Sequence, residues 1–265
     1  MMMTATLLGL CIGVSLGLTG AGGGILAVPA LMFGLGLTLT QAAPVALIAV
    51  GIASAVGALQ GLMRGLVRYK AAMLMAAVGA LTAPLGLSLA HRLPAHWLSL
   101  TFAGVMLLVA ARMVQQSRHR AAAQDAAEPP PKACRLSPET GRFVWNRLTA
   151  ATLGAIGAVS GLCTGMLGVG GGFIIVPALT HFSDARMISI VSTSLMVIAL
   201  VSAATVGSAL LHGLTLTAAQ WAFVGAAIAG MVAGRTLAPR VPQAVLQRVF
   251  AVVCVAVAAV LAWRA

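Results

Sequence analysis

Two glycine-rich segments of this chain are near copies of each other. Residues Gly20 to Leu31 read GAGGGILAVPAL, and residues Gly168 to Leu179 read GVGGGFIIVPAL. A second stretch, Gly86 to Val105, matches Gly234 to Val253 at the same offset of 148 residues and without a gap. Two regions that agree at one offset indicate a tandem duplication. The chain is therefore predicted to fold as two homologous halves with the same internal plan.

The composition of both halves indicates a lipid environment. Hydrophobic residues make up 60% of the chain and charged residues 8%, with a mean hydropathy of +1.04, whereas a soluble domain carries roughly 25% charged residues. We therefore predict an all-α polytopic membrane protein. The net charge of +12 comes from cations that flank apolar runs, as membrane topology requires. They form no separate basic domain, so no nucleic-acid partner is expected.

The apolar runs divide the chain into three parts: membrane repeat 1 (1–115), a polar central loop (116–147) and membrane repeat 2 (148–265). Each repeat begins with an apolar run that glycines interrupt, and three uninterrupted spans of roughly 20 residues follow. The interrupted runs cover 5–37 and 150–182, and the spans cover 42–63, 71–90 and 97–115, then 187–211, 219–238 and 246–263.

The arms on either side of each glycine triplet are too short for an ordinary span. With roughly 13 to 17 residues, each arm reaches only about 20–25 Å. We expect two half-helices that meet near mid-membrane and return, leaving three net crossings per half and thus inverted repeats. A single crossing would instead give parallel halves. Inversion gathers most cations on one side, namely Arg64, Arg68, Lys70, the central loop, Arg186, Arg235 and Arg240.

Further glycines recur at every fourth position in the first arm of each interrupted run. A helix would place them on one smooth face, which permits close approach of a neighbouring helix. We interpret this face as a packing surface that holds the hairpin against the bundle. The six glycines are Gly9, Gly13, Gly17, Gly157, Gly161 and Gly165.

The glycine triplets are the predicted solute site. Each triplet opens a half-helix, whose start presents unpaired N–H groups and a partial positive charge. Glycine also lets an anion approach the backbone closely. Two such starts would form an anion site without a cationic side chain, although a purely structural kink is the alternative. The triplets are Gly22, Gly23 and Gly24 in the first half and Gly170, Gly171 and Gly172 in the second.

Hydroxyl groups near the triplets could complete this site. Helical Ser and Thr side chains often bond only to their own helix carbonyls, which is the alternative for each of them. The candidates are Ser15, Thr19 and Thr164 in the first arms, and Ser192, Thr193 and Ser194 in the span that follows the second arm.

The residues missing from the apolar runs favour an anion. Carriers of cations and protons commonly place Asp, Glu or His inside the membrane, but no run holds a carboxylate and every His lies at or beyond a span end. No metal motif or nucleophile with a base within reach is evident, so neither an enzyme nor a cofactor is expected. Four cysteines show no metal or disulfide spacing. Cys163 nevertheless leaves a sulfur-relay function open.

The paired GLxGxGGGxxxxPxL-like motifs, Gly17 to Leu31 and more loosely Gly165 to Leu179, resemble those of the TauE/SafE family of sulfite exporters and probable membrane transporters. The resemblance covers nearly the whole chain apart from the central loop. It implies transport of sulfite, or of organosulfur or organic anions, across the inner membrane of a bacterium. We expect a secondary transporter that exports these anions. Family members often carry a hydroxyl patch after each motif; here the second half has Ser192 to Ser194, and the first has Pro44 to Ala46.

Several alternatives stay open alongside the anion carrier. An anion channel could use the same site, uptake could replace export, and Cys163 could relay sulfur. The expected partners are a small anionic solute and the lipid bilayer. The oligomeric state is open, and a homodimer is one option.

Overall fold

The computed structural model describes residues 2–20, 22–122, 134, 143–210, 216–238 and 251–260. Most of the predicted central loop, and parts of the last predicted span, lie outside these residues. Within them the chain is helical, with one isolated β-bridge between Cys134 and Ser183. The helices are α1 (Met2–Thr19), α2 (Gly22–Leu35), α3 (Leu39–Met63), α4 (Tyr69–Arg92), α5 (Ala95–Ala122), α6 (Arg147–Leu167), α7 (Gly172–Phe182), α8 (Met187–Leu210) and α9 (Ala218–Leu237), followed by the helical segment Ala251–Val260.

Five of the described helices are long and apolar enough to cross a membrane. Their outward faces carry large apolar side chains such as Leu59, Leu81 and Leu85, each at least 60% exposed, as lipid contact requires. The predicted class, an all-helical polytopic membrane protein, is therefore confirmed. The five candidate spans are Met2–Thr19, Thr40–Met63, Tyr69–Ala90, Arg147–Leu167 and Met187–Gly207.

Each interrupted run forms two helices that pack on each other, α1 on α2 and α6 on α7. Their lengths are unequal: 18 and 14 residues in the first pair, and 21 and 11 in the second. The first arms are thus longer than predicted, and α6 at about 32 Å is as long as an ordinary span. One cause is the side chain of Asn146, which accepts a hydrogen bond from the Thr149 N–H and starts α6 before the apolar run begins.

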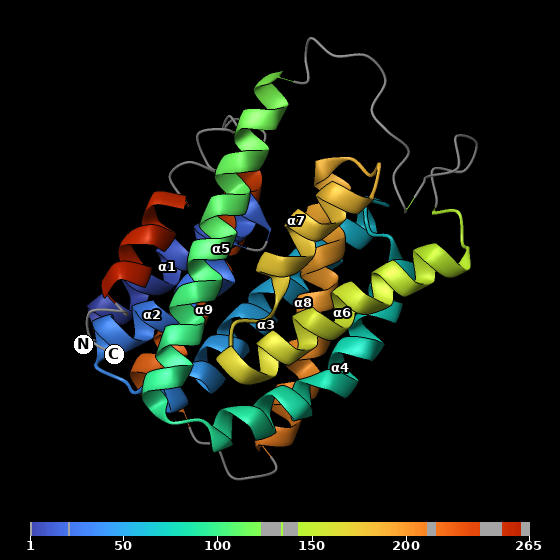
Figure 1. Ribbon diagram of the computed structural model, residues 1–265. Helices are drawn as coiled ribbons and strands as arrows, with labels where there is room; N and C mark the ends of the chain where they lie inside the picture. The colour runs from blue at the N-terminus through green and yellow to red at the C-terminus, as the bar shows by residue number, and fades with distance from the viewer. Residues whose placement is uncertain are drawn as a thin grey trace.

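The two halves interlock through reciprocal helix pairs. Helix α1 of the first half packs on α9 of the second, α6 of the second packs on α4 of the first, and α3 packs on α8 at the centre. Figure 1 shows α1, α2 and α9 on one side of α3 and α8, with α4 and α6 on the other. The largest contacts between the halves therefore recur with the halves exchanged, as expected for homologous units around a pseudo-twofold axis.

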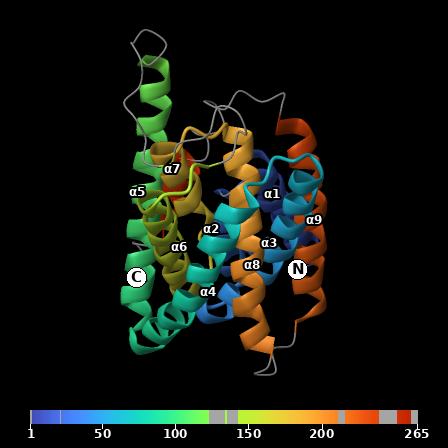
Figure 2. The ribbon, with the colours of Figure 1, turned by 90° about the vertical axis from the view of Figure 1, so that its right-hand side faces the viewer.

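Helices α3 and α8 run antiparallel. Gly61 and Gly51 of α3 lie against Ser192 and Ser202 of α8, respectively, so the numbering falls along one helix as it rises along the other. In the second view α4 starts and α5 ends toward the same end of the bundle, where α7 also lies (Figure 2). This end carries Arg64 and Arg68, and we call it the loop end.

The glycine stripes make the closest helix contacts of the bundle. A methyl carbon placed on Gly17 of α1 would lie 2.5 Å from the carbonyl oxygen of Met231 in α9. On Gly157 of α6 it would lie 2.5 Å from the carbonyl oxygen of Met75 in α4. No Cβ atom fits at such distances, so α1 and α6 each press their glycine face directly onto a backbone of the opposite half. The predicted packing role of these glycines is confirmed.

Candidate functional site

The two glycine breaks lie side by side at the centre of the bundle. A methyl carbon placed on Gly24 would lie 2.7 Å from the carbonyl oxygen of Val169 in the second break, and 3.4 Å from Cγ1 of Val50. One placed on Gly170 would lie 3.5 Å from the same Cγ1 atom. Val50 of α3 therefore touches both breaks, and the central helices bring them together.

The second break leaves several buried donors without an acceptor. Gly168, Gly170 and Gly171 all have positive φ angles, of 70°, 76° and 62°, a conformation that costs glycine little and other residues much. The first backbone bond of α7 runs from the Ile174 N–H to the Gly171 carbonyl, at 3.1 Å. Among the described residues, the N–H groups of Gly170, Gly171 and Gly172 donate to no backbone carbonyl. Unpaired buried amides are costly, which points to a ligand.

Two serine hydroxyls border the same break and also have no partner. Ser160 of α6 and Ser202 of α8 are each 1% exposed, and neither hydroxyl forms a hydrogen bond within the described structure. The Ser160 hydroxyl lies against Gly171, and the Ser202 hydroxyl is 3.7 Å from the position of a Cβ on Gly170. Leaving a buried hydroxyl unpaired costs about 1–3 kcal/mol. Amides and hydroxyls from three elements thus border the second break.

The serine at position 202 has a counterpart in the first half. Ser54 of α3 precedes it by the repeat offset of 148 residues, is 0% exposed, and also has no hydrogen-bond partner among the described residues. Ser54, Ser160 and Ser202 were not among the residues predicted for the site. The repeat offset, applied to single serines, would have found the Ser54–Ser202 pair.

Two of the three hydroxyls predicted in the first arms, those of Thr19 and Thr164, bond to their own helices. Thr164 donates to the Ser160 carbonyl at 2.8 Å, and Thr19 donates to the Ser15 carbonyl at 2.7 Å. Thr164 nevertheless lines the second break, because its Oγ1 lies 2.7 Å from the position of a Cβ on Gly171. Ser15, on α1, is half-buried.

The hydroxyls of Ser192, Thr193 and Ser194 point in three directions, because successive helical residues are about 100° apart. Ser192 accepts a hydrogen bond from Nη2 of Arg235 at 2.8 Å. Thr193 accepts one from the Arg68 N–H at 3.0 Å, which ties α8 to the α3–α4 connection. Only Ser194 contacts a glycine break, donating to the Gly20 carbonyl at 3.3 Å.

The first break is less polar than the second. Gly22 begins α2, and a Cβ on Gly23 would lie 2.5 Å from the Ile12 carbonyl oxygen and 2.6 Å from the Leu16 nitrogen. At the repeat offset, Ile12 and Leu16 stand where the second half has Ser160 and Thr164. The donor-rich site is therefore asymmetric and belongs mainly to the second half.

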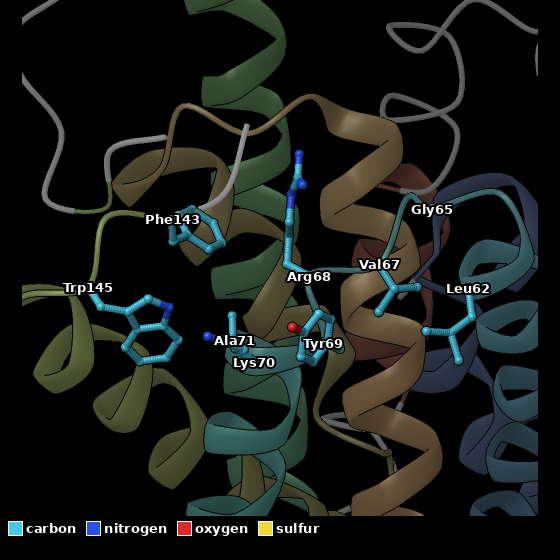
Figure 3. A pocket seen from close by; sticks show the side chains of 9 residues that line it. All are labelled: Leu62, Gly65, Val67, Arg68, Tyr69, Lys70, Ala71, Phe143 and Trp145. Atoms are coloured by element: carbon cyan, nitrogen blue, oxygen red, sulfur yellow. The ribbon is translucent and has the colours of Figure 1, made fainter. Parts of the chain in front are cut away.

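Cavities also open away from the breaks. A cavity of about 260 Å³ lies at the loop end, where Tyr69 and Lys70 extend toward Trp145 (Figure 3). A second, of about 240 Å³, lies between α5 and α7 and is lined by Arg112 and His181. Within the described residues no three His, Cys, Asp or Glu side chains could share a metal ion.

The chain has helices that can cross a membrane, and unpaired hydrogen-bond donors lie at a glycine break between them. These are features of a multi-pass membrane transporter. The chain belongs to the family described as Sulfite exporter TauE/SafE, whose sequence model matches residues 5–261. This is a family of membrane transporters and not an enzyme class.

Curated relatives agree with this assignment. The chain is 30% identical over 256 residues to a "Probable membrane transporter protein" of Xylella fastidiosa strain Temecula1, an alignment that covers 96% of this chain and 92% of the relative. A protein of the same description from Xylella fastidiosa strain 9a5c matches equally well, at 30% identity and the same coverage. No solved structure matches the chain significantly.

Proposed function

We propose that this protein is a secondary transporter that exports small anions, with sulfite or an organosulfur or organic anion as its substrate, across the inner membrane of a bacterium. The supporting observation is the second glycine break, where the amides of Gly170 to Gly172 donate to no backbone carbonyl and the hydroxyls of Ser160 and Ser202 have no partner among the described residues. The amides can only donate and the hydroxyls can donate as well, so this set of groups suits a ligand of negative charge, as do helix N-termini that bind phosphate or carboxylate.

The pairing of the halves supports an inverted repeat and a rocking mechanism. Helices α3 and α8 are equivalent elements of the two halves and pack antiparallel, as inversion requires. Each hairpin rests on the opposite half, α1 on α9 and α6 on α4. Rocking one half against the other would open the central site to each side in turn. The loop end, with Arg64 and Arg68, faces the cytoplasm.

Counterflow of radiolabelled sulfite into proteoliposomes tests the proposed function. We expect saturable uptake that requires sulfite inside the vesicles, with sulfate, thiosulfate, sulfoacetate and chloride as competitors that define the preferred anion. The Cys163→Ser variant should transport like the wild type, because backbone amides and hydroxyls need no thiol. Loss of transport in Cys163→Ser would favour a sulfur relay, and flux that neither saturates nor exchanges would favour a channel. Folded protein that moves none of these anions would contradict the proposal.

A further inference from the structure

We propose that Arg235 forms a second anion site on the substrate path, between the central glycine breaks and the loop end. This inference rests on the proposed function, which it extends from one binding position to two. The ligand is a small oxyanion, held by the guanidinium of Arg235 and the hydroxyl of Ser192.

The geometry places Arg235 inside the bundle and not in a loop. It lies in the last turn of α9, where Nη1 donates to the Gly57 carbonyl at 2.6 Å and Nη2 donates to the Ser192 hydroxyl at 2.8 Å. Glycines on α3 make this position possible, since a Cβ on Gly57 or Gly61 would lie 3.2 or 3.1 Å from the guanidinium nitrogens. The side chain therefore bridges α9, α3 and α8.

The charge of Arg235 has no counter-ion in the described structure. Its two hydrogen-bond acceptors, a carbonyl and a hydroxyl, are neutral, and no described carboxylate forms an ion pair with it. A half-buried cation without a counter-ion is expensive inside a membrane. A guanidinium carries five N–H groups, and the hydrogen bonds described above use only two of its nitrogens. An anion from solution would supply both the missing charge and the missing acceptor.

The position of Arg235 suits a binding site that an anion would pass between the loop end and the central site. Its partner Gly57 lies seven residues beyond Val50, which touches both breaks, so the two levels are about 10 Å apart along α3. At the repeat offset the position equivalent to Arg235 is Leu87, which is 39% exposed. The cation therefore occurs at one end only, and it would attract anions from the loop end toward the centre.

Thermal unfolding of the purified protein in detergent tests this site without relying on transport. The titrants are sulfite, sulfate, thiosulfate and acetate at constant ionic strength, and they are applied to the wild type and to a Ser160→Ala/Ser202→Ala background that weakens the central site. We expect anion-dependent stabilisation to persist in that background. Adding Arg235→Gln should weaken the apparent affinity at least about tenfold, since hydrogen bonds to charged groups are strong.

Two further variants separate charge from structure. Arg235→Lys keeps the positive charge and should retain part of the affinity. Arg92→Gln removes an exposed cation at the far end of α4 and should bind like its parent. Stabilisation that Arg235→Gln leaves unchanged, or a wild type that no anion stabilises, would overturn the second site. Anion binding that depends on Arg235 in a protein that shows no counterflow would instead leave this site standing and reject the proposed transport.

Discussion

Replacing Gly161 with valine is expected to prevent stable folding of the chain in the membrane. A Cβ at this position of α6 would overlap the carbonyl oxygen of Gly79 and the hydroxyl of Thr82 in α4. Even Gly161→Ala should lower the free energy of unfolding by about 1–3 kcal/mol, because the packed backbone of α4 cannot move aside. The measurement is the yield of monodisperse protein after detergent extraction, followed by its thermal unfolding.

Gly154 provides a matched control on the same helix. A Cβ there would meet nothing within 4 Å, so Gly154→Val should fold like the wild type, and Gly154→Ala should be neutral or stabilising by about 0.5–1 kcal/mol. Equal losses at Gly154 and Gly161 would mean that helix propensity, and not contact with α4, determines the outcome.

The Ser160→Ala/Ser202→Ala double variant is expected to be more stable than the wild type and a poorer transporter. Each substitution removes a buried hydroxyl that has no partner within the described structure, a defect that costs about 1–3 kcal/mol. The same hydroxyls would donate to the bound anion. We expect a higher unfolding temperature together with a KM for sulfite counterflow that rises about tenfold or more. This opposition between stability and activity is typical of functional sites.

Substitutions of the glycines themselves would test this site less cleanly. A side chain on Gly171 would meet Ser160 and require a strained φ of 62°, so a loss of transport could arise from misfolding. Ser88→Ala is the appropriate control for the double variant, because the exposed hydroxyl of Ser88 bonds to its own helix at Pro84. If the double variant gains stability but keeps wild-type counterflow, these serines do not contact the substrate.

Much of the architecture follows from local patterns in the sequence. The repeat offset, the apolar runs and the glycine triplets predict helices interrupted in equivalent places, and the structure has α1–α2 and α6–α7 there. The glycine stripes predict close contacts because only glycine allows backbones to touch. The length of α6 was underestimated because its start depends on the polar cap Asn146, which a hydropathy pattern does not register.

The most polar details of the site depend on contacts between distant helices. A single Ser160 or Ser202 in an apolar helix looks like any serine that bonds to its own carbonyl. Only the packing around Gly170 and Gly171 makes these two distinctive. Arg235 was counted among cations that flank spans, and its contact with Gly57 becomes visible only when α3 and α9 are placed together.

The most direct measurement is the anomalous map of a crystal soaked with selenite, which copies the shape and charge of sulfite and marks its own position. We expect a selenium peak beside the second break, within hydrogen-bond distance of the Gly171 amide and the hydroxyls of Ser160 and Ser202. A weaker peak is expected next to Arg235. A map from folded, saturated protein with no peak at the second break would contradict the central claim.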